Sequence, residues 1–237
     1  DKVIKSSQSN IFKIRSLAEG FKRRGYIDEA IKAYELGVKK HGAPVFYIDL
    51  IYAYRMGLKA KDLIDFSLTL VTEDPNMFSF VIKNLDVVFD DSTNTSYLQK
   101  QSLSYLQKAP GNLVFGMLLV ECYVQQKKFD LALKQIISID RFEGTKGKRV
   151  LGFARLCVKN KSFVVAGNAY SYLVNLGEFN NYYIDGQNGL INTLYAQTSL
   201  AINPNKEKIN DLTIKIKQFI DKEGVNYKTA QSIFRLA

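Results

Sequence analysis

A repeated spacing of 34 residues constrains this sequence more than any other feature. Small and large apolar residues in the stretch Ile14–Tyr34 return in the same order 102 residues later, and once more 34 residues after that. The matching positions are Ala18, Phe21, Ala30 and Tyr34, then Val120, Tyr123, Ala132 and Ile136, then Ala154, Cys157, Ala166 and Tyr170. A period of this length is typical of proteins built from stacked structural repeats.

Each repeat is predicted to be a pair of antiparallel helices. In repeat one, the apolar spacing predicts helices over Ile11–Arg24 and Ile27–Lys40, with Gly25 at the turn between them. Ala18 and Ala30 are the small residues that let the two helices approach closely. A chain of such pairs is all-α.

At these positions the chain resembles the tetratricopeptide repeat (TPR) family, whose 34-residue unit has a small residue, an aromatic, an alanine and another aromatic in these slots. The resemblance implies an all-α fold, a right-handed α-α superhelix in which antiparallel helix pairs form a solenoid. It also implies one domain over residues 1–237, with about five repeats over 11–178. Residues 179–237 would then be a divergent repeat followed by C-terminal capping helices.

Repeats two and three depart most from the pattern. In repeat two, we place Ala53 in the small slot, one residue out of phase. In repeat three, we expect one helix over Phe78–Phe89, a polar turn over residues 90–95 and a second helix over Tyr97–Lys108. Asp86 falls where a small apolar residue is expected, so the packing there needs an explanation.

The 34-residue phase fails after Phe179. We expect a longer helix over Tyr182–Ile202, a break at Asn203-Pro204-Asn205, an amphipathic helix over Glu207–Lys222 and a short last helix over Tyr227–Leu236. Atypical terminal repeats are common in solenoids because the last apolar face must be covered.

Charge leaves two classes of partner open. The formal net charge is +10, and basic residues gather in residues 1–25 and 144–161, with an acidic zone over residues 62–91 between them. Basic clusters attract anionic partners, so a protein that binds RNA or another polyanion is the alternative to a protein-binding scaffold. The acidic zone interrupts a continuous positive track and favours the scaffold.

No reactive constellation is predicted. The single histidine, His41, and the cysteines Cys122 and Cys157 do not have the spacing of zinc ligands, and we expect the cysteines to be free thiols in the core. Residues 144–149 are similar to a phosphate-binding loop but lack its first glycine and its hydroxyl residue, so a basic loop between repeats is expected. We therefore expect no enzymatic activity, no metal and no cofactor.

The sequence says little about compartment. No apolar run is long enough to cross a bilayer, so membrane insertion is not expected. The chain begins at Asp1, which suggests a mature form or an excised fragment. The cytoplasm is slightly favoured, and a periplasmic or exported origin stays open.

The resemblance also implies a binding surface, because the first helix of each TPR unit lines an inner, concave groove. Such a groove would suit a protein or peptide with apolar anchors and acidic flanks. The residues that the register places in the groove are Arg15, Glu19, Lys22 and Arg23 in repeat one, Tyr47, Leu50 and Tyr54 in repeat two, Lys83 in repeat three, Met117, Glu121 and Gln125 in repeat four, and Lys148, Arg155 and Lys159 in repeat five.

Overall fold

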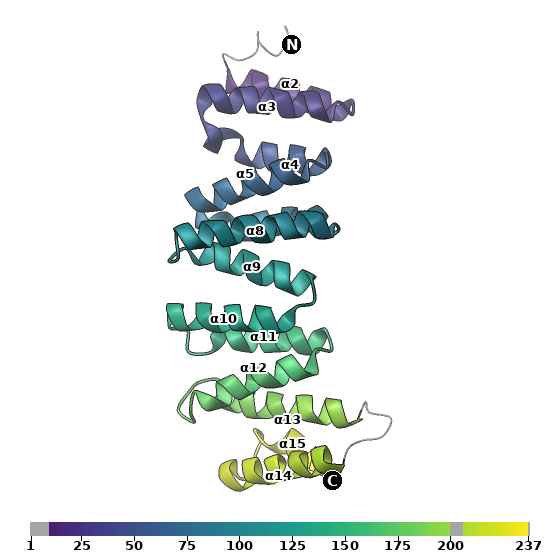
Figure 1. The fold of residues 1–237 in the computed structure, drawn as a ribbon, viewed down its shortest axis with the longest axis vertical. Coiled ribbons are helices and arrows are strands. Elements are labelled where there is room, and N and C mark those ends of the chain that lie inside the picture. Colours follow the sequence, from purple (N-terminus) through teal and green to yellow (C-terminus); the bar gives the residue numbers. More distant parts are fainter. Residues whose placement is uncertain (1–9, 200–205, 237) are drawn as a thin grey trace. The chain divides into compact units, whose positions relative to one another are not determined.

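The computed structural model describes residues 10–199 and 206–236, and over these residues the secondary structure is helical, without strands (Figure 1). The chain separates into two compact units, an N-terminal unit over Asp1–Leu118 and a C-terminal unit over Leu119–Ala237. Each unit is an all-α solenoid in which consecutive helices pack on one another. The prediction of a single domain over 1–237 stays a prediction.

The N-terminal unit contains three successive helical hairpins. Its helices pack in chain order, α2 on α3, α3 on α4 and α4 on α5, and α5 also contacts α8. The elements are α2 (Ile11–Arg23), α3 (Ile27–His41), the 3-10 helix η1 (Ala43–Phe46), α4 (Tyr47–Met56), α5 (Ala60–Glu73), the 3-10 helix η2 (Pro75–Met77), α6 (Phe78–Asn84), α7 (Asp86–Phe89) and α8 (Ser92–Lys108); α9 (Leu113–Gln125) crosses into the next unit.

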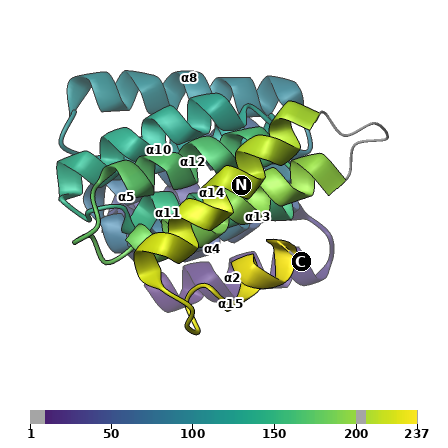
Figure 2. The same cartoon turned by 90° about the horizontal axis from the view of Figure 1, so that it is seen from below.

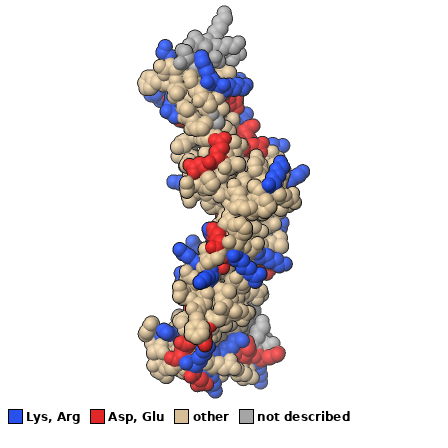
Figure 3. Space-filling model, turned by 90° about the vertical axis from the view of Figure 1, so that its left-hand side faces the viewer, with Lys and Arg blue, Asp and Glu red and all other residues tan. Residues whose placement is uncertain are grey.

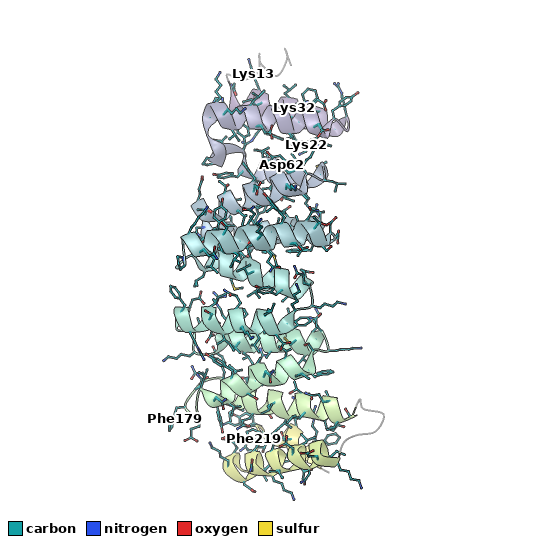
Figure 4. All side chains as sticks on the ribbon, viewed as in Figure 1. Lys13, Lys22, Lys32, Asp62, Phe179 and Phe219 are labelled. Atoms are coloured by element: carbon teal, nitrogen blue, oxygen red, sulfur yellow. The ribbon has the colours of Figure 1, made fainter. Side chains whose placement is uncertain are left out.

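The C-terminal unit continues the hairpin pattern and ends in two closing helices. Its elements are α10 (Phe129–Glu143), α11 (Lys148–Lys159), α12 (Phe163–Asn175), α13 (Tyr183–Ser199), α14 (Lys206–Glu223) and α15 (Ala230–Leu236). Both α14 and α15 contact α13 (Figure 2). Leu212, Ile216 and Phe219 of α14 form an apolar cluster with Ile191 of α13, and Phe219 is labelled on α14 in Figure 4. The expected break at residues 203–205 lies outside the described residues.

The small slots of the sequence pattern are packing positions, as predicted. Ala18, Ala30, Ala132, Ala154 and Ala166 are all completely buried. A methyl side chain at these sites lets neighbouring helix backbones approach closely, which larger side chains would prevent. The predicted free thiols are also confirmed, because both cysteines are buried and unbonded.

The turn inside each clear hairpin has one recurring geometry. Gly25, Leu58, Lys127 and Lys161 all have positive φ, between 53° and 80°. Each donates its N–H to the carbonyl three residues earlier, and the next residue donates to the carbonyl five residues earlier, as Tyr26 does to Phe21. This is the Schellman ending of a helix, which satisfies carbonyls that would otherwise lack a partner.

The recurring turn corrects the register of repeat two. Leu58 lies 33 residues after Gly25, so the counterpart of Ala18 is Ile51, which is completely buried, and the register built on Ala53 is two residues too long. The same one-residue shortening carries into repeat three, where Leu85 takes the slot and is completely buried. The problem at Asp86 disappears, because this residue lies just past the slot and is exposed.

Two boundaries in repeat three also differ from expectation. The helix expected over Phe78–Phe89 is interrupted at Leu85, beside Asn84, whose side-chain amide donates to the carbonyl of Phe80 and so competes with the backbone. The turn expected over residues 90–95 is mostly helix, because Asp91 caps α8 by accepting from the N–H groups of Thr93 and Asn94.

No helix in the described part of the chain is both long enough and apolar enough to cross a membrane.

Candidate functional site

The predicted groove residues of α2 are exposed or half-buried, and three of them are already engaged in hydrogen bonds or ion pairs. Arg15 pairs with Asp49 of α4, with 2.9 Å between Nε and Oδ2, and donates to the carbonyl of Val45. Glu19 accepts from Lys22 at 2.7 Å and from the hydroxyl of Tyr34 at 3.0 Å. The Lys22 ammonium therefore holds the pKa of the Glu19 carboxyl below its usual value. Arg23 is exposed.

The three groove residues predicted in repeat two are not on the surface. Tyr47, Leu50 and Tyr54 are buried, because the register that selected them was wrong. The Tyr54 hydroxyl donates to Glu35 at 2.9 Å, and the Tyr47 hydroxyl donates to Glu73. Burial, with the hydrogen bond to Glu73, raises the pKa of Tyr47 to about 12. These residues stabilise the packing of α4 and cannot present side chains to a ligand.

A different face of α4 is exposed, and it is apolar. Ile48, Tyr52 and Met56 are 49%, 44% and 51% exposed. They are spaced four residues apart and so lie along one side of the helix. We call these three residues the α4 stripe. Counted by the shared turn, Ile48, Tyr52 and Met56 stand in repeat two where Arg15, Glu19 and Arg23 stand in repeat one.

Residues of α6 and α7 lie next to the α4 stripe or to its neighbour Arg55. The Tyr52 ring meets the ring of Phe80 edge to face, with 5.6 Å between centroids. Arg55 binds Asp86 through two hydrogen bonds of 2.9 and 2.6 Å. The Arg55 guanidinium holds the pKa of the Asp86 carboxyl below its usual value. The predicted groove residue Lys83 is exposed on α6.

The groove residues predicted on α9 are partly occupied with one another. Gln125 donates to Glu121 across one helical turn at 2.7 Å. Met117 is half-buried. The place of these three residues in a groove stays a prediction.

In the C-terminal unit the predicted residues Lys148 and Lys159 are exposed, whereas Arg155 borders a cleft. Arg155 pairs with Asp185 of α13 at 2.9 Å. The cleft has a volume of about 420 Å³ and lies between α11, α12, α13 and the segment that leads into α15. Its lining residues are Leu151, Arg155, Tyr170, Ile184, Asp185, Asn188, Gly189, Asn192, Tyr227, Lys228 and Gln231.

Among the groove residues predicted above, only Arg155 lines this cleft. The α4 stripe was also missed. Because α4 is apolar on nearly every side, its periodicity does not distinguish the buried face from the exposed one. The one usable signal was the turn, since Gly57-Leu58-Lys59 can be aligned with Arg24-Gly25-Tyr26.

The loop that resembled a phosphate-binding site has its donors already satisfied from within. Asp140 is 1% exposed and accepts from the backbone N–H of Gly147 at 2.8 Å, the N–H of Arg149 at 3.2 Å and the hydroxyl of Thr145. A buried carboxylate of the chain itself thus accepts from loop donors of the kind that a phosphate would need. This loop connects α10 and α11, which agrees with the prediction of a basic loop between two helical repeats.

The described residues contain no cluster of three or more metal-ligating side chains. Burial raises the pKa of both Cys122 and Cys157 to about 12, so both are neutral thiols at physiological pH.

Comparisons with known proteins give no assignment of family. No protein-family model matches the sequence, and no curated protein matches it. A solved structure from the functional characterization of Pseudomonas aeruginosa PilF aligns with 95% of this chain and 97% of that chain, at 14% identity and a TM-score of 0.37. At this level of similarity we base no argument on it.

Proposed function

We propose that this protein is a non-enzymatic scaffold of the TPR type that binds a protein partner through an extended or helical segment laid along the first helices of its repeats. The observation that carries the proposal is the α4 stripe, in which three large apolar side chains are exposed in a row. The 34-residue pattern over residues 11–178 supports the TPR assignment.

The stripe has the chemistry of a binding anchor. Tyrosine and methionine are enriched at the centres of protein interfaces, because they offer large contact areas that lose water on binding. Aligned apolar groups on an otherwise polar surface are unfavourable in water unless something covers them part of the time. The pairs Arg15–Asp49 and Arg55–Asp86 stand beside the stripe as polar edges that can set the orientation of a bound segment.

The polyanion alternative loses support from the ion pairs. Arg15, Lys22, Arg55, Arg149 and Arg155 each bind a carboxylate, which weakens the local attraction of these five cations for a phosphate backbone. Figure 3 shows basic and acidic side chains interspersed with wide uncharged areas on the face that it presents.

The proposal can be tested with a display library of random 15-residue peptides selected against the full chain. Affinities of the enriched peptides are then measured by fluorescence anisotropy for the native protein, for Tyr52→Glu and for Tyr26→Glu. Tyr26 is the matched control, because it is an exposed tyrosine at the α2–α3 turn and not in the stripe. Loss of a central aromatic anchor costs about 2 kcal/mol or more, which is roughly a 30-fold weaker affinity.

We expect Tyr52→Glu to lose that affinity and Tyr26→Glu to keep it. Equal affinities for all three proteins would move the binding surface away from α4. In a parallel titration with a generic single-stranded RNA, sub-micromolar binding that weakens steeply with salt would overturn the scaffold in favour of a polyanion-binding protein.

A further inference from the structure

The side chain of Arg235 is only partly buried, but one of its guanidinium nitrogens is enclosed by the protein. Arg235 lies near the end of α15, and its guanidinium stacks on the ring of Tyr195 of α13, 4.4 Å from the centroid. Its Nη1 is buried and has no hydrogen-bond acceptor among the described residues. Burying a guanidinium nitrogen without an acceptor is costly, so such a group usually serves a ligand or a structural partner.

Arg235 borders a cavity of about 320 Å³. The walls that matter for binding are Asn192 and Thr193 on α13, Tyr170 on α12, and the apolar side chains Val158 and Phe163. Tyr170, Gly189 and Asn192 also line the 420 Å³ cleft described above, so the two spaces adjoin. Pockets for small organic ligands have volumes of about 300–1,000 Å³.

The charge of these two spaces is positive. Their lining contains three cations, Arg155, Lys228 and Arg235, and one acid, Asp185. Asp185 is already paired with Arg155. The Lys228 ammonium is only loosely paired, since its Nζ lies 3.9 Å from the carboxylate of Glu223. The surplus charge and the unsatisfied donor therefore point the same way, toward an anion.

The shape of the site depends on one glycine. At Gly189, a Cβ atom would lie 2.3 Å from the Tyr170 ring, so only glycine lets α12 and α13 approach as closely as they do. The close approach places the Tyr170 ring against both spaces.

We propose that these two adjoining spaces bind a carboxylate-bearing ligand, with Arg235, which lines the 320 Å³ cavity, as its anchor. The planar guanidinium matches a carboxylate in geometry, and stacking on Tyr195 fixes the plane of its donors. Val158 and Phe163 suit the carbon skeleton of the ligand. The carboxylate can belong to a free small acid or to a glutamate side chain of a bound peptide. This site is separate from the α4 stripe and does not depend on it.

Isothermal titration calorimetry on the full chain at constant ionic strength tests the proposal. The probes are succinate, a peptide with blocked ends and one central glutamate, and inorganic phosphate. The variants are Arg235→Gln, Arg235→Lys and the control Arg141→Gln. Arg141 is also an arginine over a tyrosine ring in the same unit, 5.5 Å from Tyr172, but it does not border the cleft. Thermal melts followed by circular dichroism show whether each variant is folded.

We expect saturable binding of succinate, of the glutamyl peptide or of both, and the probe that binds identifies the source of the carboxylate. Arg235→Gln should weaken binding by about tenfold or more, because a charge-assisted hydrogen bond is lost. Arg235→Lys should weaken it less, and Arg141→Gln should not change it. Binding that Arg235→Gln leaves intact, no saturable binding of either carboxylate probe, or phosphate binding as tight as that of the carboxylates would each overturn the proposal.

Discussion

Replacing Asp140 by alanine tests how the link between α10 and α11 is held. The carboxylate lies near the end of α10 and collects three donors from the following loop, the hydroxyl of Thr145 and the N–H groups of Gly147 and Arg149. Gly147 has a φ of 101°, and a Cβ there would lie 2.6 Å from Leu173. The loop is thus fixed in a conformation that both the glycine and the carboxylate require.

The expected loss of stability in Asp140→Ala follows from the three donors that lose their acceptor. The N–H of Gly147 is buried at its hydrogen bond to Asp140 and loses its acceptor. Hydrogen bonds to a charged group contribute about 1.5–3 kcal/mol each, and the desolvation of the carboxylate offsets part of the sum. We expect the free energy of unfolding to fall by about 3–5 kcal/mol, as for other broken buried networks. Asp140→Asn retains one acceptor oxygen and should lose less.

Urea denaturation followed by circular dichroism at the helical band measures the loss, with Asp221→Ala on the exposed side of α14 as the control. Amide hydrogen exchange locates it, because the N–H groups of Gly147 and Arg149 should lose protection in Asp140→Ala. A loss below about 1 kcal/mol, or unchanged protection of these two amides, would refute the role assigned to Asp140.

Three further predictions concern packing, turn strain and thiol reactivity. Gly189→Ala should lower the free energy of unfolding by about 1–3 kcal/mol, because the new methyl group meets the Tyr170 ring. Urea denaturation measures this change, and an unchanged stability would mean that α12 and α13 separate easily. Lys161→Gly should stabilise the protein by about 1 kcal/mol in the same assay, since φ is 59° at this turn, and destabilisation would contradict the Schellman assignment. At pH 8, iodoacetamide should not modify Cys122 or Cys157 in the native protein, because a pKa of about 12 keeps both thiols neutral. Rapid labelling of the native protein, detected by mass spectrometry, would contradict the burial of these thiols.

The repeat pattern predicted most of the helices and the principal packing positions. Ala18, Ala30, Ala132, Ala154 and Ala166 could be identified from spacing alone, because close helix packing needs a small side chain at a fixed interval. Ala53 is also completely buried, but the register taken from it was two residues too long. In α4 almost every position is apolar, so several registers satisfy the pattern equally well.

The candidate site was predicted only in part, for the same reason. Arg15, Arg23 and Lys83 are exposed on first helices, as expected. Leu50 and Tyr54 are buried, and the exposed Tyr52 takes the place that they were given. A shift of one or two residues rotates a helix face by 100° or 200°, so a small error of register replaces the surface residues by core residues.

The sequence by itself determined the all-α class, the hairpin unit and the alanine slots, because helical periodicity and the need for close packing are properties of neighbouring residues along the chain. Tertiary structure decided which side of α4 meets solvent, since that depends on contacts with α3 and α5. It also decided the surroundings of Arg235, whose guanidinium lies over the Tyr195 ring and which lines one cavity together with Val158 and Phe163. These residues are up to 77 positions apart, and no local pattern links them, so only the packing of α15 against α13 brings Arg235 to this cavity.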